Sequence, residues 1–264
     1  MKPVEVELCR WMVVCFAPLD AARSFYIKED EDEDRYGFVL LNVPGTEPDG
    51  YRSPVCLGQM FWFRCLVDHI LSTGSGKKIV ICGGNDRHFI TIACCLLGAF
   101  LILIEDLAID NLLKIFDPVF HQCYGFSELC QERYLMPGLS VVDVWQAIEL
   151  AKQFGWLDFR NELVDIDKCI DMQEYCHYDS AANGLLHTVI PSRVLAFSVP
   201  EDLHSQADWS KESWAIKNDR RYFGPRYYAE ILSQDYDVQL LVRCDIDEDD
   251  PGDDEWDGDR PCTP

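Results

Sequence analysis

The 264-residue chain has a shortage of basic residues, no apolar run long enough to cross a membrane, and no regular cysteine spacing. Its 23 Lys and Arg residues face 46 Asp and Glu residues, for a net charge of −23. Sequence-independent nucleic-acid binders neutralise phosphates with basic side chains, so nucleic acid is not expected as a partner. The longest apolar run, residues 89–104, falls short of the roughly 20 residues of a membrane span and predicts a buried helix instead.

Much of the negative charge lies in two short runs. Six acidic residues occupy positions 29–34, and ten lie within positions 245–259. The rest of the chain has 30 acidic residues against 23 basic ones. We therefore expect a solvated acidic loop, an acidic disordered tail and a moderately acidic folded body that favours basic partners.

The thirteen cysteines form neither a disulfide framework nor the paired short spacings of a zinc site. Glu5 and Glu7 precede an apolar run that Pro18 interrupts, whereas a signal peptide begins with basic residues and continues without a break. The sequence thus predicts reduced thiols, a cytoplasmic or nuclear location or both, and neither a metal nor a cofactor. A membrane is not expected as a partner.

Strand-like and helix-like segments alternate along the chain, which is typical of an α/β fold with a mainly parallel central sheet flanked by helices. We expect a helix over 106–116 that Pro118 stops, and a loop over the Pro- and Gly-rich segment 43–54. The strands are expected at 4–16, 38–43, 77–82, 194–198 and 238–242, and the other helices at 57–71, 89–104 and 141–154.

The most informative local feature is a strand, a glycine-bearing turn and a helix over residues 77–104. Cysteine phosphatases bind phosphate with this geometry, using a cysteine at the end of the strand and an arginine six positions later. Here Arg87 follows Cys82 by five positions, and Ile81 precedes Cys82 where those enzymes have histidine. None of the thirteen cysteines has an arginine six positions on. We therefore predict no catalytic residue and interpret Cys82 and Arg87 as a degenerate phosphate loop.

Three stretches resemble the cell-division-cycle-fourteen family of dual-specificity protein phosphatases. The third stretch is the most specific, because its EYxHY, NG and IPxRxxAF segments follow in the family's order. The resemblance covers residues 8–243, most of the chain. The stretches are SPVCLGQMFWF (53–63), KKIVICGGNDRHFITIACCLLGAFLIL (77–103) and EYCHYDSAANGLLHTVIPSRVLAF (174–197).

The resemblance implies a dual-specificity-phosphatase-like N-terminal domain over residues 1–200 and a helical linker over 201–235. Residues 236–244 resemble the first strand of a catalytic domain that this sequence lacks, and residues 245–264 are the acidic tail. In the family, the first domain is non-catalytic and helps to shape an acidic groove for substrates that have basic residues beyond the phosphosite.

The resemblance offers Glu174 and Asp179 as substrate-binding residues, because both keep the acidic type. Cys176 stands where the family usually has glutamate, and Arg226 where a glutamate commonly follows the proline. These departures leave open the alternative that Glu174 and Asp179 are ordinary surface charges.

The implied function is the substrate-recognition or scaffolding part of a phosphatase that dephosphorylates phosphoserine, phosphothreonine or phosphotyrosine. The alternative is a stand-alone pseudophosphatase that acts as a protein-interaction module. Expected partners are phosphoproteins or basic peptide segments, and either a catalytic phosphatase domain or a second copy of the chain.

Overall fold

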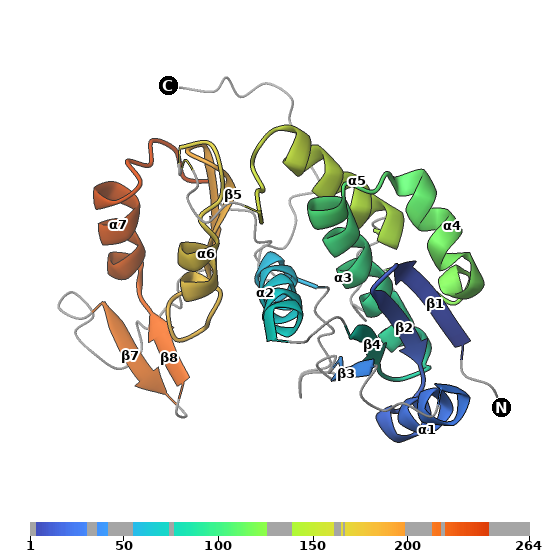
Figure 1. Ribbon diagram of the computed structural model, residues 1–264. Helices are drawn as coiled ribbons and strands as arrows, with labels where there is room; N and C mark the ends of the chain where they lie inside the picture. Colours follow the sequence, from blue (N-terminus) through green and yellow to red (C-terminus); the bar gives the residue numbers. More distant parts are fainter. Residues whose placement is uncertain are drawn as a thin grey trace, which may run out of the picture. The chain divides into compact units, whose positions relative to one another are not determined.

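The computed structural model describes residues 4–30, 36–41, 55–73, 77–125, 139–160, 165, 167–198, 213–217 and 220–242 (Figure 1). The chain divides into two compact units, Met1–Asp179 with His187–Ala196 and Ser180–Leu186 with Phe197–Pro264. The predicted loop at 43–54, the acidic tail and most of the acidic run at 29–34 lie outside the described residues.

The first unit is built on a four-stranded sheet with the order β1-β2-β4-β3. β4 (Lys78–Cys82) is parallel to both β2 (Met12–Phe16) and β3 (Tyr36–Leu40), while β1 (Val4–Cys9) is antiparallel to β2. The predicted mainly parallel α/β sheet is confirmed. The single strand expected over 4–16 is instead the β1–β2 hairpin, which pairs the backbone of both halves within one sheet.

Helices cover both faces of this sheet (Figure 1). α1 (Leu19–Asp30) packs beside Val13, Val80 and their neighbours in a small apolar cluster on one face. The larger cluster lies on the other face and includes residues of five helices. These helices are α2 (Leu57–Thr73), α3 (Arg87–Glu105), α4 (Ile109–Phe120), α5 (Val141–Gln153) and α6 (Met172–Tyr178).

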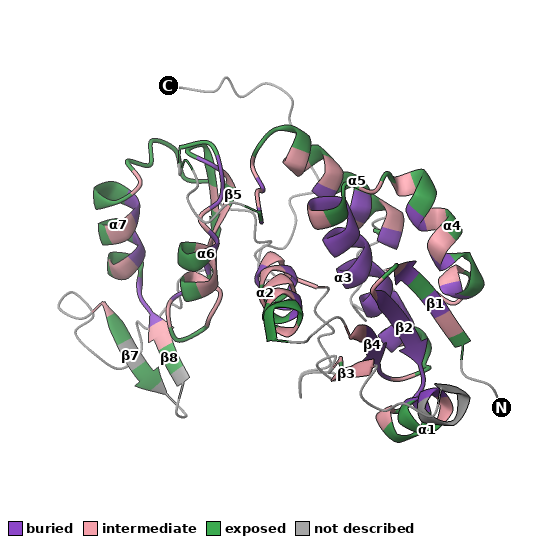
Figure 2. Ribbon diagram, in the orientation of Figure 1, coloured by how far each residue is buried: buried purple, intermediate pink, exposed green. Residues whose placement is uncertain are grey.

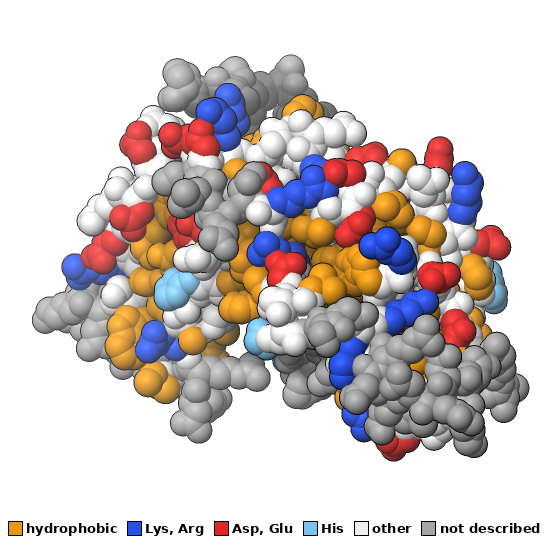
Figure 3. All heavy atoms as spheres, in the orientation of Figure 1, with side chains coloured by type: hydrophobic (Ala, Val, Ile, Leu, Met, Phe, Trp, Pro, Cys, Tyr) orange, Lys and Arg blue, Asp and Glu red, His pale blue; other side chains and the backbone are white. Residues whose placement is uncertain are grey.

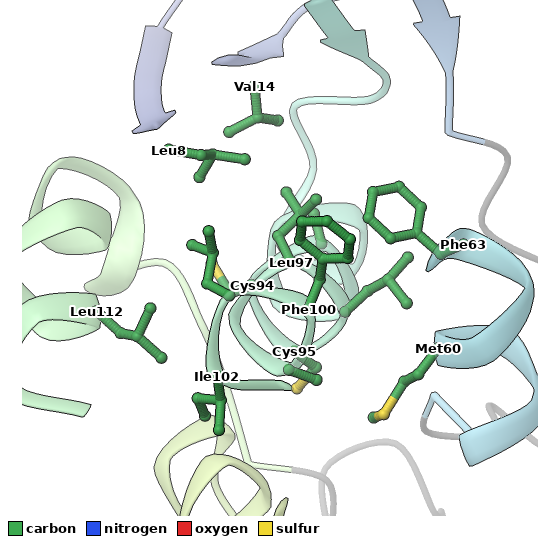
Figure 4. Packing of buried hydrophobic residues seen from close by; sticks show 14 of the residues in the cluster. Leu8, Val14, Met60, Phe63, Cys94, Cys95, Leu97, Phe100, Ile102 and Leu112 are labelled. Atoms are coloured by element: carbon green, nitrogen blue, oxygen red, sulfur yellow. The ribbon is translucent and has the colours of Figure 1, made fainter. Parts of the chain in front are cut away.

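α3 lies at the centre of the large cluster, and β2 and β4 are its most buried strands (Figure 2). All fifteen residues from Phe89 to Leu103 are buried. Strand residues Leu8 and Val14, Met60 and Phe63 of α2, and Leu112 of α4 surround the helix in Figure 4. α3 is long and apolar enough to cross a membrane, but 83% of its apolar window is buried inside the protein, so the predicted buried helix is confirmed.

α4 continues beyond the proline that was expected to end it. Pro118 lies inside the helix, which reaches Phe120. A proline costs an interior helix one hydrogen bond and a clash with the preceding turn. Here only the last turn is affected, and it places Val119 in the core with no exposed surface. Burial of Val119 therefore outweighs the local cost.

The second unit contains the hairpin β7 (Trp214–Lys217) and β8 (Arg220–Phe223), followed by α7 (Pro225–Gln234). The linker expected over 201–235 was interpreted as helical, but these strands occupy part of it. Trp214 and Ile216 alternate with other residues as in a strand, and Arg221 lies over the Trp214 ring at 4.8 Å. Among the described residues of the linker, only those of α7 are helical.

The segment expected as the first strand of a further domain joins no sheet within residues 236–242, the part of it that the structure describes. Leu240, Leu241 and Val242 are 77%, 65% and 68% exposed. A strand is stable only when a neighbouring strand pairs its backbone groups. The strand expected here is not formed within the described residues.

Candidate functional site

The turn between β4 and α3 is where the sequence places a degenerate phosphate loop. Along β4, Ile79 and Ile81 belong to the cluster around α3, whereas Val80 and Cys82 belong to the cluster beside α1. The Cys82 side chain thus lies on the opposite face of the sheet from α3. Burial raises the pKa of the Cys82 thiol to about 12, so the thiolate is disfavoured at neutral pH.

Arg87, at the start of α3, is engaged away from the turn. Its Nε donates to the carbonyl oxygen of Gln122 at 3.1 Å, and its guanidinium lies over the Tyr124 ring at 5.3 Å. Cys82 is on the α1 side and Arg87 holds the segment after α4. The structure does not bring these two predicted residues together.

Side chains of the protein itself fill the turn. A Cβ added at Gly83 would lie 1.9 Å from the Phe89 ring, so this ring covers the backbone of the turn. The Asp86 side chain caps α3 by accepting from the Phe89 backbone N–H at 3.0 Å. The helix N-terminus already has its carboxylate, and a second anion would meet that negative charge.

Asp179, offered as a substrate-binding residue, lies at the end of α6 (Met172–Tyr178) beside the start of α2. Its Oδ2 accepts from the Cys56 thiol at 3.1 Å, and its Oδ1 is 3.8 Å from Nε2 of His187. A Cβ at Gly58 would be only 2.9 Å from Oδ2, so the missing side chain lets the carboxylate approach α2. Asp179 thus joins α6 to α2.

The Cys56 thiol in this group is not activated as a nucleophile. Burial, with a smaller contribution from its hydrogen bond to Asp179, raises the pKa of Cys56 to about 11. An activated cysteine needs the opposite shift. The arrangement of Cys56, Asp179 and His187 is therefore structural.

Sequence reasoning missed this contact, because 123 positions separate Cys56 from Asp179. The available signal was Gly58 within the SPVCLGQMFWF stretch, since an early helix glycine indicates close approach of another group.

Glu174 differs from Asp179 in being exposed on α6. A charged ligand can therefore reach this residue at the surface. Acidic and basic side chains of described residues are interspersed on the face shown in Figure 3. Glu174 is the better placed of the two acids for a basic ligand, because it is exposed whereas Asp179 is half-buried.

The NG segment of the third stretch, Asn183-Gly184, contacts α7 in the second unit. Gly184 has a φ of +104°, a conformation that only glycine adopts readily, and its carbonyl accepts from the Tyr228 hydroxyl at 2.7 Å. The Tyr227 hydroxyl donates to the carbonyl of Asn183 at 3.0 Å. The NG turn and the two tyrosines of α7 therefore form one packed structure.

Comparison with known proteins points to one group of phosphatases, although no family model matches the chain. The human dual specificity protein phosphatase CDC14C is 26% identical over 243 residues, which are 89% of this chain and 46% of that protein. The Caenorhabditis elegans tyrosine-protein phosphatase cdc-14 is 32% identical over 150 residues, 56% of this chain and 18% of that protein. This chain is similar to the CDC14 phosphatases over most of its length.

The zebrafish dual specificity protein phosphatase CDC14AB is similar to a smaller part, at 25% identity over 69% of this chain and 27% of that protein. The chain spans less than half the length of these CDC14 relatives. The relationship and the sheet topology together fit a dual-specificity-phosphatase-like α/β fold.

Proposed function

We propose that this chain is a non-catalytic, dual-specificity-phosphatase-like N-terminal domain that binds phosphoproteins or basic peptide segments for a CDC14-type phosphatase. The observation that carries the proposal is the filled β4–α3 turn. Phe89 covers Gly83, Asp86 occupies the helix N-terminus, and Cys82 lies on the other face of the sheet. A reacting phosphate finds no thiolate at this turn, and the carboxylate of Asp86 at the helix N-terminus would repel it.

Binding of basic segments is supported by the acidic body and by the exposed carboxylate of Glu174. Asp179 takes a structural part in this proposal, because both of its oxygens are engaged by Cys56 and His187. Salt screens the electrostatic attraction to an exposed carboxylate, so the affinity that Glu174 contributes should fall as the salt concentration rises.

The alternative function is a stand-alone pseudophosphatase that acts as a protein-interaction module. Both functions use the same fold. In the first, the domain recognises substrates for a catalytic phosphatase domain, and in the second it binds proteins on its own. A transcript that continues into a His-Cys signature, with arginine six positions after the cysteine, would favour the phosphatase part. A transcript without that signature would favour the stand-alone module.

One experiment tests the proposed function with the purified chain. We expect no turnover of an aryl phosphate, together with measurable binding of a fluorescent phosphopeptide that has basic residues after the phosphosite. Glu174→Gln should weaken that binding severalfold at low salt. The matched control, Glu105→Gln at the exposed end of α3, should leave it unchanged.

Two results would contradict the proposal. Vanadate-sensitive turnover that disappears in Cys82→Ser would make the chain an enzyme. Equal binding of peptides with and without basic residues, unaffected by Glu174→Gln, would remove the recognition role of α6.

A further inference from the structure

Two thiols meet where the end of α4 returns to α3. Cys94 is a buried residue of α3, on the side of that helix that faces Leu112 of α4 (Figure 4). Cys123 follows α4, is half-buried and packs against the same apolar cluster. Cys94 lies three residues beyond Thr91 on α3, and the Thr91 Oγ1 accepts from the backbone N–H of Tyr124, the residue after Cys123, so the two thiols are neighbours. A buried thiol thus contacts a partly accessible one.

The segment that carries Cys123 is fixed by residues of the first turns of α3. Arg87 holds the Gln122 carbonyl at 3.1 Å and stacks on Tyr124. The Thr91 Oγ1 accepts from the Tyr124 backbone N–H at 3.3 Å and lies 2.8 Å from the Arg87 carbonyl oxygen, to which it donates. Cys123 is therefore held beside a cation and a hydroxyl.

These neighbours favour the thiolate of Cys123. The hydrogen bond from Cys94 lowers the pKa of Cys123 most, and the Thr91 hydroxyl and the Arg87 charge lower it further against the opposing effect of burial. The Thr91 hydroxyl has one hydrogen, which can rotate from the Arg87 carbonyl to a thiolate. By contrast, burial raises the pKa of Cys9, a similarly half-buried thiol, and the charges of Glu105 and Glu7 add to this effect.

We propose that Cys123 is a peroxide-reactive modification site and that Cys94 resolves its oxidised form into a Cys94–Cys123 disulfide. The Cys123 thiolate attacks one oxygen of hydrogen peroxide, the O–O bond breaks, and the leaving hydroxide takes a proton to become water. Cys123 is then a sulfenic acid. The Cys94 sulfur attacks the sulfenic sulfur, and the S–O bond breaks as the Cys94 proton leaves with the hydroxyl as a second water. Both cysteines are oxidised by one electron each, and the peroxide is reduced by two.

The placement of the pair suits this sequence of steps. Peroxide reaches the half-buried Cys123 before the buried Cys94, and the resolving thiol is its neighbour. The residues between the two cysteines include all of α4, so the new bond would tie the end of α4 to the core helix. Reduction by a small dithiol restores the original state.

The test uses the reduced, full-length chain and hydrogen peroxide. After brief oxidation, the remaining thiols are alkylated and the digest is mapped by mass spectrometry. We expect a cross-linked Cys94–Cys123 peptide that a dithiol removes. Labelling of Cys123 by a thiolate-selective reagent should be at least about tenfold faster than labelling of Cys9, which reflects a larger thiolate fraction.

Two variants separate the steps. In Cys94→Ala the sulfenic acid on Cys123 has no resolving thiol, so a dimedone adduct should accumulate there. In Cys123→Ser the cross-link should disappear, while Cys9→Ser should leave it intact. The map of the wild-type chain decides the question even if Cys94→Ala does not fold. Slower labelling of Cys123 than of Cys9, a Cys123 cross-link to another cysteine, or over-oxidation of Cys123 without a cross-link would overturn the proposal.

Discussion

At the scale of single residues, the core depends on glycines that let aromatic rings lie against the backbone. Gly98 is the clearest case, since a Cβ there would lie 2.1 Å from Nε1 of Trp145. Trp145 is completely buried, and its Nε1 donates to the Cys94 carbonyl at 3.1 Å. The ring cannot move away without losing that buried hydrogen bond. Gly98 is therefore required by packing, although glycine is a poor helix former.

Gly98→Ala should destabilise the protein, although replacing glycine by alanine inside a helix usually stabilises it. Alanine normally stabilises a helix interior relative to glycine by roughly 0.5–1 kcal/mol. Here we expect a net loss of about 1–3 kcal/mol in the free energy of unfolding, because the added methyl overpacks the site. Urea unfolding measures it. Gly37→Ala is the control: a Cβ at Gly37 meets nothing within 4 Å, so stability should stay within about 0.5 kcal/mol. Equal effects at both positions would refute the packing argument.

At the scale of elements, the C-terminus of α3 is capped by cations from a neighbouring helix and loop. Lys152 of α5 donates to the Ile102 carbonyl, and Arg160 donates to the Ile104 carbonyl. Both also bind the carboxylate of Asp106, which ends α3 in a left-handed conformation with φ 55°. Positive charge at this end complements the helix dipole. Asp106 holds the two cations in place.

The Asp106 group should contribute to the pH dependence of stability. The hydrogen bond from Lys152, followed by that from Arg160, lowers the pKa of Asp106 in the folded chain. Its stabilisation is therefore present above the unfolded pKa, near 4, and is lost as pH falls through the lower folded value. Asp106→Asn should be less stable than wild type at pH 7, with the difference shrinking by pH 3. Thermal unfolding against pH measures it, with Glu149→Gln on α5 as the control. A stability difference between wild type and Asp106→Asn that does not change with pH would contradict this role of Asp106.

Segments with a strong local signal were predicted well from the sequence. The run after Arg87 is apolar on every side, and only a central core helix satisfies that pattern. β4 was equally clear because its β-branched run ends at Gly83. The sequence failed where tertiary contacts decide, as in the fold-back of β1 on β2 and the hairpin β7–β8.

The candidate site divides in the same way. Cys82 and Arg87 follow one another closely, so their wrong spacing was visible in the sequence. The engagement of Asp179 by Cys56 and His187 was not visible, because it depends on how α6 packs against α2.

At the scale of the whole molecule, the end of the described chain is an apolar segment without a sheet partner. We expect the amides of Val238–Val242 to exchange quickly in the isolated chain, because this segment joins no sheet among the described residues. The exception is the Val238 N–H, which donates to the Leu232 carbonyl. Addition of a partner domain, or a concentration at which the chain self-associates, should slow that exchange. Hydrogen exchange read by mass spectrometry measures both. Slow exchange of this segment in a demonstrated monomer would mean that the chain pairs it internally.

The burial of α3 has a consequence for the life of the newly made chain. Before the sheet and the other helices assemble around it, Arg87–Glu105 has the length and hydropathy of a membrane span. During synthesis, folding of the chain around this helix therefore competes with binding of the helix to lipid or to chaperones. Because α2, α4 and α5 all pack on the same helix, any variant that delays their docking prolongs the exposure. Cellular abundance should thus follow how quickly α3 is covered, and not only how stable the finished protein is.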